Sequence, residues 1–133
     1  GENLQDKTFA VWGLAFKPGT DDMREAPAIR LIEELTTRGA QIRAYDPQAM
    51  KTAENFYLKD VKNIAYIKNK YDALNDVDAL IIVTEWKEFQ SPDFMEISQR
   101  MKGDIIFDGR NIYKARTVRN YNLKYYQIGV QKK

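Results

Sequence analysis

Residues 8–27 read TFAVWGLAFKPGTDDMREAP and pass from an apolar run, through a polar loop, to the start of a helical pattern. The run at residues 9–14 is typical of a buried strand, and Pro27 suits the first turn of a helix, where its missing N–H is harmless. Open α/β sheets bind ligands at the loop that follows the first strand. This loop carries two cations, Lys17 and Arg24, among glycines, prolines and acids. We therefore expect the functional site to lie here.

Apolar runs and helical patterns alternate along the rest of the chain. Strands are predicted at residues 9–14, 41–45, 64–67, 79–83, 105–107 and 125–130, and helices at residues 27–39, 47–57, 72–74, 91–101 and 114–121. The run at 79–83 is apolar at every position, which is typical of a parallel strand buried on both faces. The alternation predicts an α/β fold: a Rossmann-like, doubly wound, mostly parallel sheet of about six strands, with helices on both faces.

Composition narrows the chemistry open to the chain. Its 133 residues are 44% hydrophobic and 30% charged, which is ordinary for one globular domain. Cysteine and histidine are both absent, so the chain supplies no disulfide, thiolate metal site, cysteine nucleophile or imidazole base. No apolar run approaches the roughly 18 residues of a membrane-spanning helix, and no signal peptide is visible. We expect a cytoplasmic protein without a membrane partner or a metal site.

The basic residues are unevenly distributed. Residues 110–133 contain seven cations and no acids. These are Arg110, Lys114, Arg116, Arg119, Lys124, Lys132 and Lys133. Such a tail can meet a phosphate-bearing partner, and it can equally be a solvated helix face followed by a frayed end. The second interpretation is favoured.

Polar clusters follow three of the predicted strands, at residues 13–27, 84–89 and 108–111. The carboxyl ends of parallel strands open on one edge of the sheet, and the first and fourth strands are neighbours in this topology. We therefore expect the three clusters to converge on one crevice.

The first loop does not contain the dinucleotide fingerprint G-x-G-x-x-G, because Gly13 is not followed by its second and third glycines. Asp21, Asp22 and Glu25 lie where the helix begins, and they would repel a phosphate there. An anion near this loop must therefore be held by side chains, and Lys17 and Arg24 are the candidates.

Each candidate has a structural alternative. Lys17 and Arg24 can instead form a surface salt-bridge network with the three acids of their loop, and spacing alone does not decide between the two interpretations. Arg110 can pair with Asp108, two residues before it.

The remaining candidates favour structural roles. Trp86 and Phe89 are expected to pack rather than to stack on a ligand. Asp46 ends the second strand, where nucleotide-binding folds often place a ribose-binding acid, but it lies 33 residues beyond Gly13 rather than about 20. Because Asp-Pro is a common turn or cap signal, a capping role is favoured for Asp46.

Four motif blocks resemble one known family. The stretch GLAFKPGTDDMREAP at residues 13–27 resembles the signature that opens the C-terminal domain of the UDP-glucose/GDP-mannose dehydrogenase family. The blocks at 45–47 (YDP), 84–89 (TEWKEF) and 107–111 (FDGRN) match later parts of that signature in the same order, so the likeness spans residues 8–130. The block at 84–89 is most similar to the UDP-glucose 6-dehydrogenase branch. Ala26 stands where a serine is common, a small departure.

The resemblance implies a three-domain enzyme of which residues 1–133 are the single C-terminal, UDP-binding domain. Members oxidise the C6 hydroxyl of a sugar nucleotide to a carboxylate in two NAD-dependent steps, through a covalent intermediate on a cysteine. By resemblance, Phe16, Lys17 and Arg110 bind the UDP-sugar, and Arg24 faces NAD across the cleft to another domain. The catalytic residues have no counterpart here, so we expect the fragment to be inactive alone.

The resemblance also bears on partners. Members dimerise through a central domain, so we expect this fragment to be monomeric and the parent to be a homodimer or larger. Two alternatives stay open. The sugar nucleotide can be GDP-mannose or a UDP-N-acetylhexosamine, or the chain can be a separate nucleic-acid-binding or regulatory module that uses its basic tail. No nucleic-acid partner is expected under the favoured interpretation.

Overall fold

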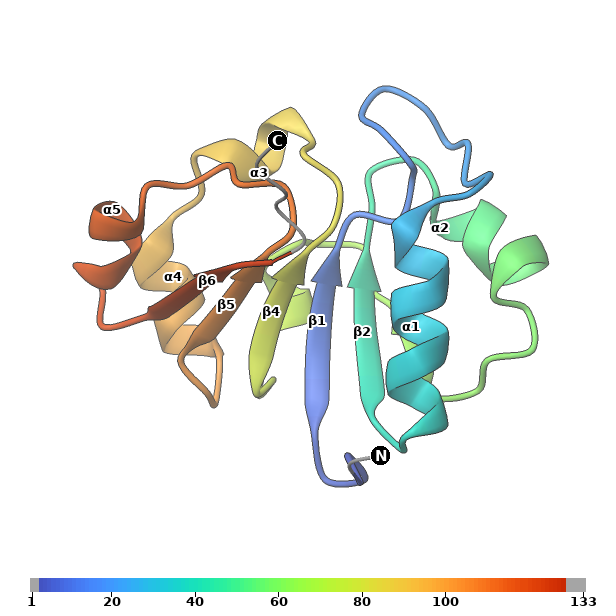
Figure 1. Cartoon of the computed structure of the whole chain (residues 1–133), viewed down its shortest axis with the longest axis horizontal. Helices are drawn as coiled ribbons and strands as arrows, with labels where there is room; N and C mark the ends of the chain where they lie inside the picture. The colour runs from blue at the N-terminus through green and yellow to red at the C-terminus, as the bar shows by residue number, and fades with distance from the viewer. Residues whose placement is uncertain (1–2, 129–133) are drawn as a thin grey trace.

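A computed structural model describes residues 3–128 of the chain. Its core is one six-stranded sheet in which every pairing is parallel, with the strand order β3-β2-β1-β4-β5-β6 (Figure 1). The strands are β1 (Thr8–Trp12), β2 (Gln41–Tyr45), β3 (Ile64–Tyr66), β4 (Ala79–Ile82), β5 (Ile105–Asp108) and β6 (Lys124–Gln127). The predicted doubly wound fold is confirmed, and the order changes direction between β1 and β4.

Helices lie on both sides of this sheet. They are α1 (Pro27–Thr37), α2 (Met50–Thr52), the π-helix η1 (Ala53–Tyr57), the 3-10 helix η2 (Asp72–Leu74), α3 (Lys87–Gln90), α4 (Phe94–Arg100) and α5 (Ala115–Arg119). Figure 1 shows α1 in front of the sheet, beside β2, and α4 behind β5 and β6. The two halves of the sheet are thus covered from opposite sides, as right-handed crossovers require.

Most predicted element boundaries differ from the structure by one to three residues, and three differences are of another kind. The predicted helix at 47–57 begins only at Met50 and continues as the π-helix η1. The helix α3 was not predicted, since residues 84–89 were expected to form a polar loop. The predicted last strand reached residue 130, but β6 ends at Gln127, and positions 129 and 130 lie outside the described residues.

The centre of the core is the pair β1 and β4. All four residues of β4 are buried, and Val11 and Ile82 on these strands are fully buried. The ring of Trp12 stacks on Phe89 with centroids 4.8 Å apart. Burial on both faces explains the continuous apolar run of β4, and it fixes the strand ends that carry the polar loops.

Helix α1 begins at Pro27, as the sequence predicts, and ends at Thr37, two residues before the predicted end at Gly39. Pro27 occupies its first turn, and Ala28 and Ile32 are buried against the sheet. Gly39 follows the helix with φ of +101°, a backbone conformation that glycine adopts without steric cost. The helix therefore holds the far end of the loop that starts at Gly13. Among residues 3–128, no helix is both long and apolar enough to cross a membrane.

Candidate functional site

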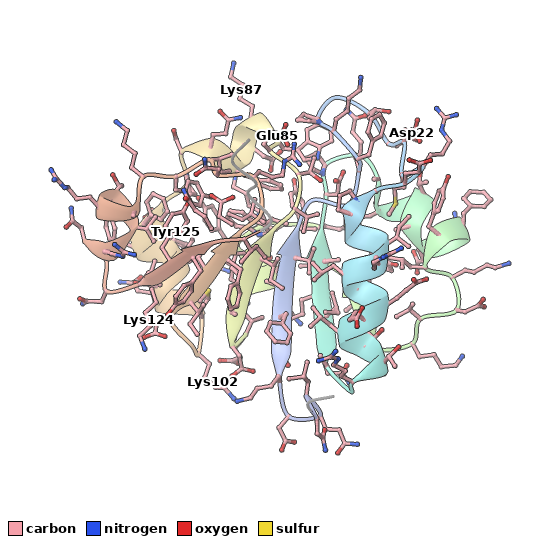
Figure 2. The ribbon with its side chains drawn as sticks, viewed as in Figure 1. Asp22, Glu85, Lys87, Lys102, Lys124 and Tyr125 are labelled. Carbon is pink, nitrogen blue, oxygen red and sulfur yellow. The ribbon has the colours of Figure 1, made fainter. Side chains whose placement is uncertain are left out.

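The three polar clusters meet at the carboxyl edge of the sheet, as predicted. β1 pairs with β4, and β4 pairs with β5, so the loops that follow these strands are neighbours. The Thr84 hydroxyl donates a hydrogen bond of 2.6 Å to the carbonyl of Ala15, which joins the first and second loops. Figure 2 shows Asp22 and Glu85 at this edge and Lys102 at the opposite one.

Asp46 lies at the centre of this edge and is fully buried. One carboxylate oxygen accepts hydrogen bonds from the backbone N–H groups of Gln48 and Ala49, at 2.8 Å each. Asp46 thus caps the turn ahead of α2, while the helix itself begins after Ala49 without a side-chain cap. The other oxygen accepts from the N–H groups of Leu14 and Ala15 at 2.7 and 3.0 Å. The Trp86 indole adds a third bond to that oxygen, at 3.0 Å. The side chain is therefore occupied by protein donors, in agreement with the favoured interpretation.

The aromatic residues after β4 are packing residues, as predicted. Phe89 is fully buried and Trp86 is 8% exposed. Tyr45 contacts Phe89 edge-on and donates to the Glu88 carboxylate at 2.8 Å. Burial and that carboxylate raise the pKa of Tyr45 well above its usual value.

Asp108 organises the third loop. Its carboxylate accepts hydrogen bonds of 2.8 Å from the N–H groups of Arg110, Asn111 and Ile112. The hydroxyl of Tyr125 on β6 donates a further bond of 2.6 Å. Asp108 is thus used by backbone donors and by Tyr125.

The Arg110 side chain turns to Glu85 rather than to Asp108. Its Nε and Nη2 lie 2.8 and 3.4 Å from the two Glu85 oxygens. The expected alternative, an ion pair with Asp108, is therefore wrong. Sequence reasoning missed Glu85 as the partner, although an acid directly after β4 and a cation after the adjacent β5 carried that signal. The ion pair links the second and third loops.

The first loop exposes Phe16 and Lys17. The Phe16 N–H bonds to the Asp22 carbonyl at 3.0 Å, which closes the loop, while 38% of Phe16 remains exposed. The Lys17 ammonium lies 5.4 Å from the centroid of the Phe16 ring. Within residues 3–128, Lys17 forms no ion pair. The salt-bridge alternative therefore fails for Lys17.

Arg24, in contrast, does form a salt bridge with an acid of its own loop. Its guanidinium binds both oxygens of Asp22, with Nη2 at 2.7 Å and Nε at 3.1 Å. The hydrogen bonds from Arg24 lower the pKa of the Asp22 carboxyl. The Arg24 side chain is nevertheless 79% exposed, so its outer side faces solvent while Asp22 orients it.

The basic tail is only partly described. Lys114, Arg116, Arg119 and Lys124 are exposed, and in the described part of the chain none of them forms an ion pair. Lys132 and Lys133 lie outside that part. No cluster of three or more potential metal ligands occurs between residues 3 and 128.

The doubly wound parallel sheet, with side-chain cations on the loops after β1 and β5 at its carboxyl edge, is typical of α/β domains of the nucleotide-binding class. Residues 10–115 match the UDP binding domain of the UDP-glucose/GDP-mannose dehydrogenase family. The chain belongs to this family, as its UDP-binding domain.

Its relatives agree with this family. The chain is 42% identical to a UDP-glucose 6-dehydrogenase of Pseudomonas aeruginosa over 94% of its length, and 38% identical to that of Rhizobium meliloti over 97%. It resembles a solved UDP-glucose dehydrogenase from Pyrobaculum islandicum, with 32% identity, a TM-score of 0.74 and 93% of this chain covered. It spans only 28% and 29% of the two relatives and 26% of the solved chain.

Proposed function

We propose that this chain forms the part of the substrate site that binds the nucleotide sugar in an NAD-dependent UDP-glucose 6-dehydrogenase. Residues 1–133 would be the single C-terminal domain of a three-domain subunit that oxidises UDP-glucose to UDP-glucuronate in two steps. The proposal is supported by the UDP-binding family match and by the 42% identity to a UDP-glucose 6-dehydrogenase. We further propose that the parent enzyme is cytoplasmic, serves polysaccharide biosynthesis and is a homodimer or larger, while the isolated fragment is monomeric.

The observation that carries the proposal is the placement of Lys17 and Arg110 on two converging loops of one sheet edge. A flexible ammonium and a planar guanidinium are suited to the charged oxygens of a diphosphate. Glu85 fixes the Nε and Nη2 side of Arg110, and Nη1 makes no hydrogen bond within residues 3–128. Phe16 offers an exposed apolar ring beside Lys17 for the sugar or the base.

Arg24 fits a contact with NAD held by another domain. Its guanidinium is oriented by Asp22 and is open to solvent on its outer side, which suits a cofactor that approaches from across a cleft. The first loop has no glycine fingerprint to hold a pyrophosphate itself. When bound, NAD supplies the hydride acceptor. Because this chain contains no cysteine or histidine, we assign it no catalytic residue and expect no turnover from it alone.

Titration of the purified chain with UDP and with UDP-glucose, by calorimetry, tests the proposal. We expect Lys17→Ala and Arg110→Ala each to weaken UDP binding about tenfold, since a charge-assisted hydrogen bond contributes about 1.5 kcal/mol. Arg38→Ala is a matched control, because Arg38 is as exposed as Arg110 (39% against 40%) and also pairs with a glutamate, but on α1. Lys102, at the opposite sheet edge, is the control for Lys17. UDP binding that is unchanged by both site substitutions would overturn the assignment.

A second sugar nucleotide is the main alternative. A solved structure with 29% identity and a TM-score of 0.73 is a UDP-D-ManNAc dehydrogenase from Pyrococcus horikoshii. Parallel titrations with UDP, GDP and UDP-N-acetylglucosamine distinguish the candidates. We expect UDP to bind more tightly than GDP. Tighter binding of GDP than of UDP would favour GDP-mannose as the substrate. Clearly tighter binding of UDP-N-acetylglucosamine than of UDP-glucose would favour a UDP-N-acetylhexosamine.

A further inference from the structure

Asp46 connects three segments that are far apart in the sequence. Its five donors come from Leu14 and Ala15 after β1, from Gln48 and Ala49 after β2, and from Trp86 after β4. The carboxylate is fully buried, so we assign it no direct contact with a ligand.

Two of these connections lead directly to the proposed ligand contacts. On one side, the N–H groups of Leu14 and Ala15 precede the exposed pair Phe16 and Lys17. On the other side, the Trp86 indole holds the segment whose neighbouring residue, Glu85, pairs with Arg110 at 2.8 Å. Asp46 is therefore connected to the backbone two residues before Lys17 by hydrogen bonds, and to the Arg110 side chain through the Trp86 indole, the chain segment of Glu85 and the Glu85 ion pair.

We propose that Asp46 is a positioning residue, which sets the spacing between Lys17 and Arg110 for a diphosphate without touching it. This inference rests on the proposed function, because it takes these two cations to be the ligand contacts. Binding energy depends on groups that are held in place before the ligand arrives.

The direction in which UDP affinity changes when Asp46 is neutralised distinguishes a positioning role from a purely electrostatic one. Asp46 carries a carboxylate at the edge where an anionic ligand would bind, so its neutralisation should favour the ligand by Coulomb's law. Loss of positioning predicts the opposite. In Asp46→Asn, an NH₂ group replaces an oxygen that accepts two or three N–H groups. Because the NH₂ group is itself a donor, it repels these N–H groups, and the segments that carry them must move away.

The test is a calorimetric titration of UDP into wild type, Asp46→Asn, Lys17→Ala and the double variant, at a temperature where thermal unfolding shows each to be folded. We expect Asp46→Asn to weaken binding about tenfold, the effect of about 1.4 kcal/mol. If Asp46 positions Lys17, the loss caused by Lys17→Ala will be much smaller in the Asp46→Asn background. Residues that act independently would give additive losses, and that result would overturn the proposal.

Trp86→Phe carries the test if Asp46→Asn does not fold. It deletes the indole bond to Asp46 together with part of a ring that is only 8% exposed, and we expect binding to weaken about threefold. Trp12→Phe is the matched control, because its indole also donates one bond of 3.0 Å, to the Lys70 carbonyl. The Trp12→Phe variant also has Trp86 as its single tryptophan, and we expect the fluorescence of Trp86 to change when UDP is added. Equal effects of the two substitutions would point to stability alone and overturn the proposal.

The outcomes for the two proposals are distinguishable. A wild-type chain that does not bind UDP would overturn the proposed function and this inference together. If wild type binds UDP and Lys17→Ala weakens it, while Asp46→Asn and Trp86→Phe bind as wild type does, the function stands and only the positioning role falls.

Discussion

Two buried aspartates hold the carboxyl edge of this sheet, and they do so differently. Asp46 follows β2 and Asp108 ends β5, and both are fully buried. The donors to Asp46 come from three separate segments, up to 40 residues away along the chain. Those to Asp108 are the next few backbone N–H groups and one hydroxyl from the adjacent β6.

The two loops are therefore held in place by different kinds of contact, local in one and long-range in the other. The loop after β5 is turned by an aspartate that bonds to its own successors, a local arrangement that a short peptide can already favour. The loop after β1 takes its shape only when β2 and the segment after β4 are in place. Its cation, Lys17, therefore depends on the whole sheet, whereas Arg110 depends mainly on its own turn and on Glu85.

The largest expected effect is on stability in Asp46→Ala. It leaves five donors without their acceptor, most of them buried, and each buried unsatisfied group costs about 1–3 kcal/mol before the structure relaxes. We expect the free energy of unfolding to fall by about 4 kcal/mol, a large part of the 5–15 kcal/mol typical of a domain. Urea denaturation followed by circular dichroism measures it. A loss below 1 kcal/mol would mean that the three segments hold one another without Asp46.

The glycines of the two loops give the second test. Gly13 has φ of +106°, and a Cβ there would lie 2.5 Å from the backbone nitrogen of Thr84. At Gly109 the nearest atom would be the Ile82 carbonyl oxygen, at 3.0 Å, with no positive φ. We expect Gly13→Ala to lower the free energy of unfolding by about 3 kcal/mol and Gly109→Ala by about 1 kcal/mol. Equal losses in urea titrations would contradict the view that only the first loop is built by close packing between segments.

The contrast also explains how far the sequence could be used to predict the site. Local patterns sufficed for the strands and for α1 from Pro27, whereas residues 108–111 were recognised only as a polar cluster and not as a turn held by Asp108. Topology then predicted that the loops after β1, β4 and β5 converge. The partner of Arg110 was not predictable from local spacing, because Glu85 lies 25 residues away. The role of Asp46 beyond its cap was missed for the same reason, since its partners on the first loop are about 30 residues distant.

Asp108→Ala should have a smaller effect than the change at Asp46. Its three backbone donors are only partly buried, so water can replace the lost acceptor. We expect a loss of about 2 kcal/mol in the free energy of unfolding, because the Tyr125 hydroxyl can still donate to the Tyr113 carbonyl, 3.1 Å away. Urea denaturation beside Asp46→Ala gives the comparison directly. A loss of stability as large as that of Asp46→Ala would contradict the view that Asp108 stabilises only its own loop while Asp46 stabilises three segments.

The smallest effect is expected in Tyr125→Phe, which removes a hydroxyl that bonds to Asp108 and also to the backbone of Tyr113. The Tyr125 hydroxyl donates 2.6 Å to Asp108, and we expect its removal to cost about 1 kcal/mol at neutral pH. Burial, and next the hydrogen bond to Asp108, raise the pKa of Tyr125 to about 12 in the folded chain, from a usual 10. The folded state thus binds this proton more tightly, so the stability that it contributes is complete below pH 10 and is lost as the pH rises toward 12.

The variant should therefore lose less stability than wild type between pH 10 and 12, and the two curves should approach each other. Urea titrations at pH 7, 10, 11 and 12 measure this difference, and the other tyrosines cancel because both proteins carry them. Parallel curves over that range would show that neither burial nor Asp108 raises the pKa of Tyr125 on folding. The comparison of the two aspartates would then rest on the stability losses of Asp46→Ala and Asp108→Ala.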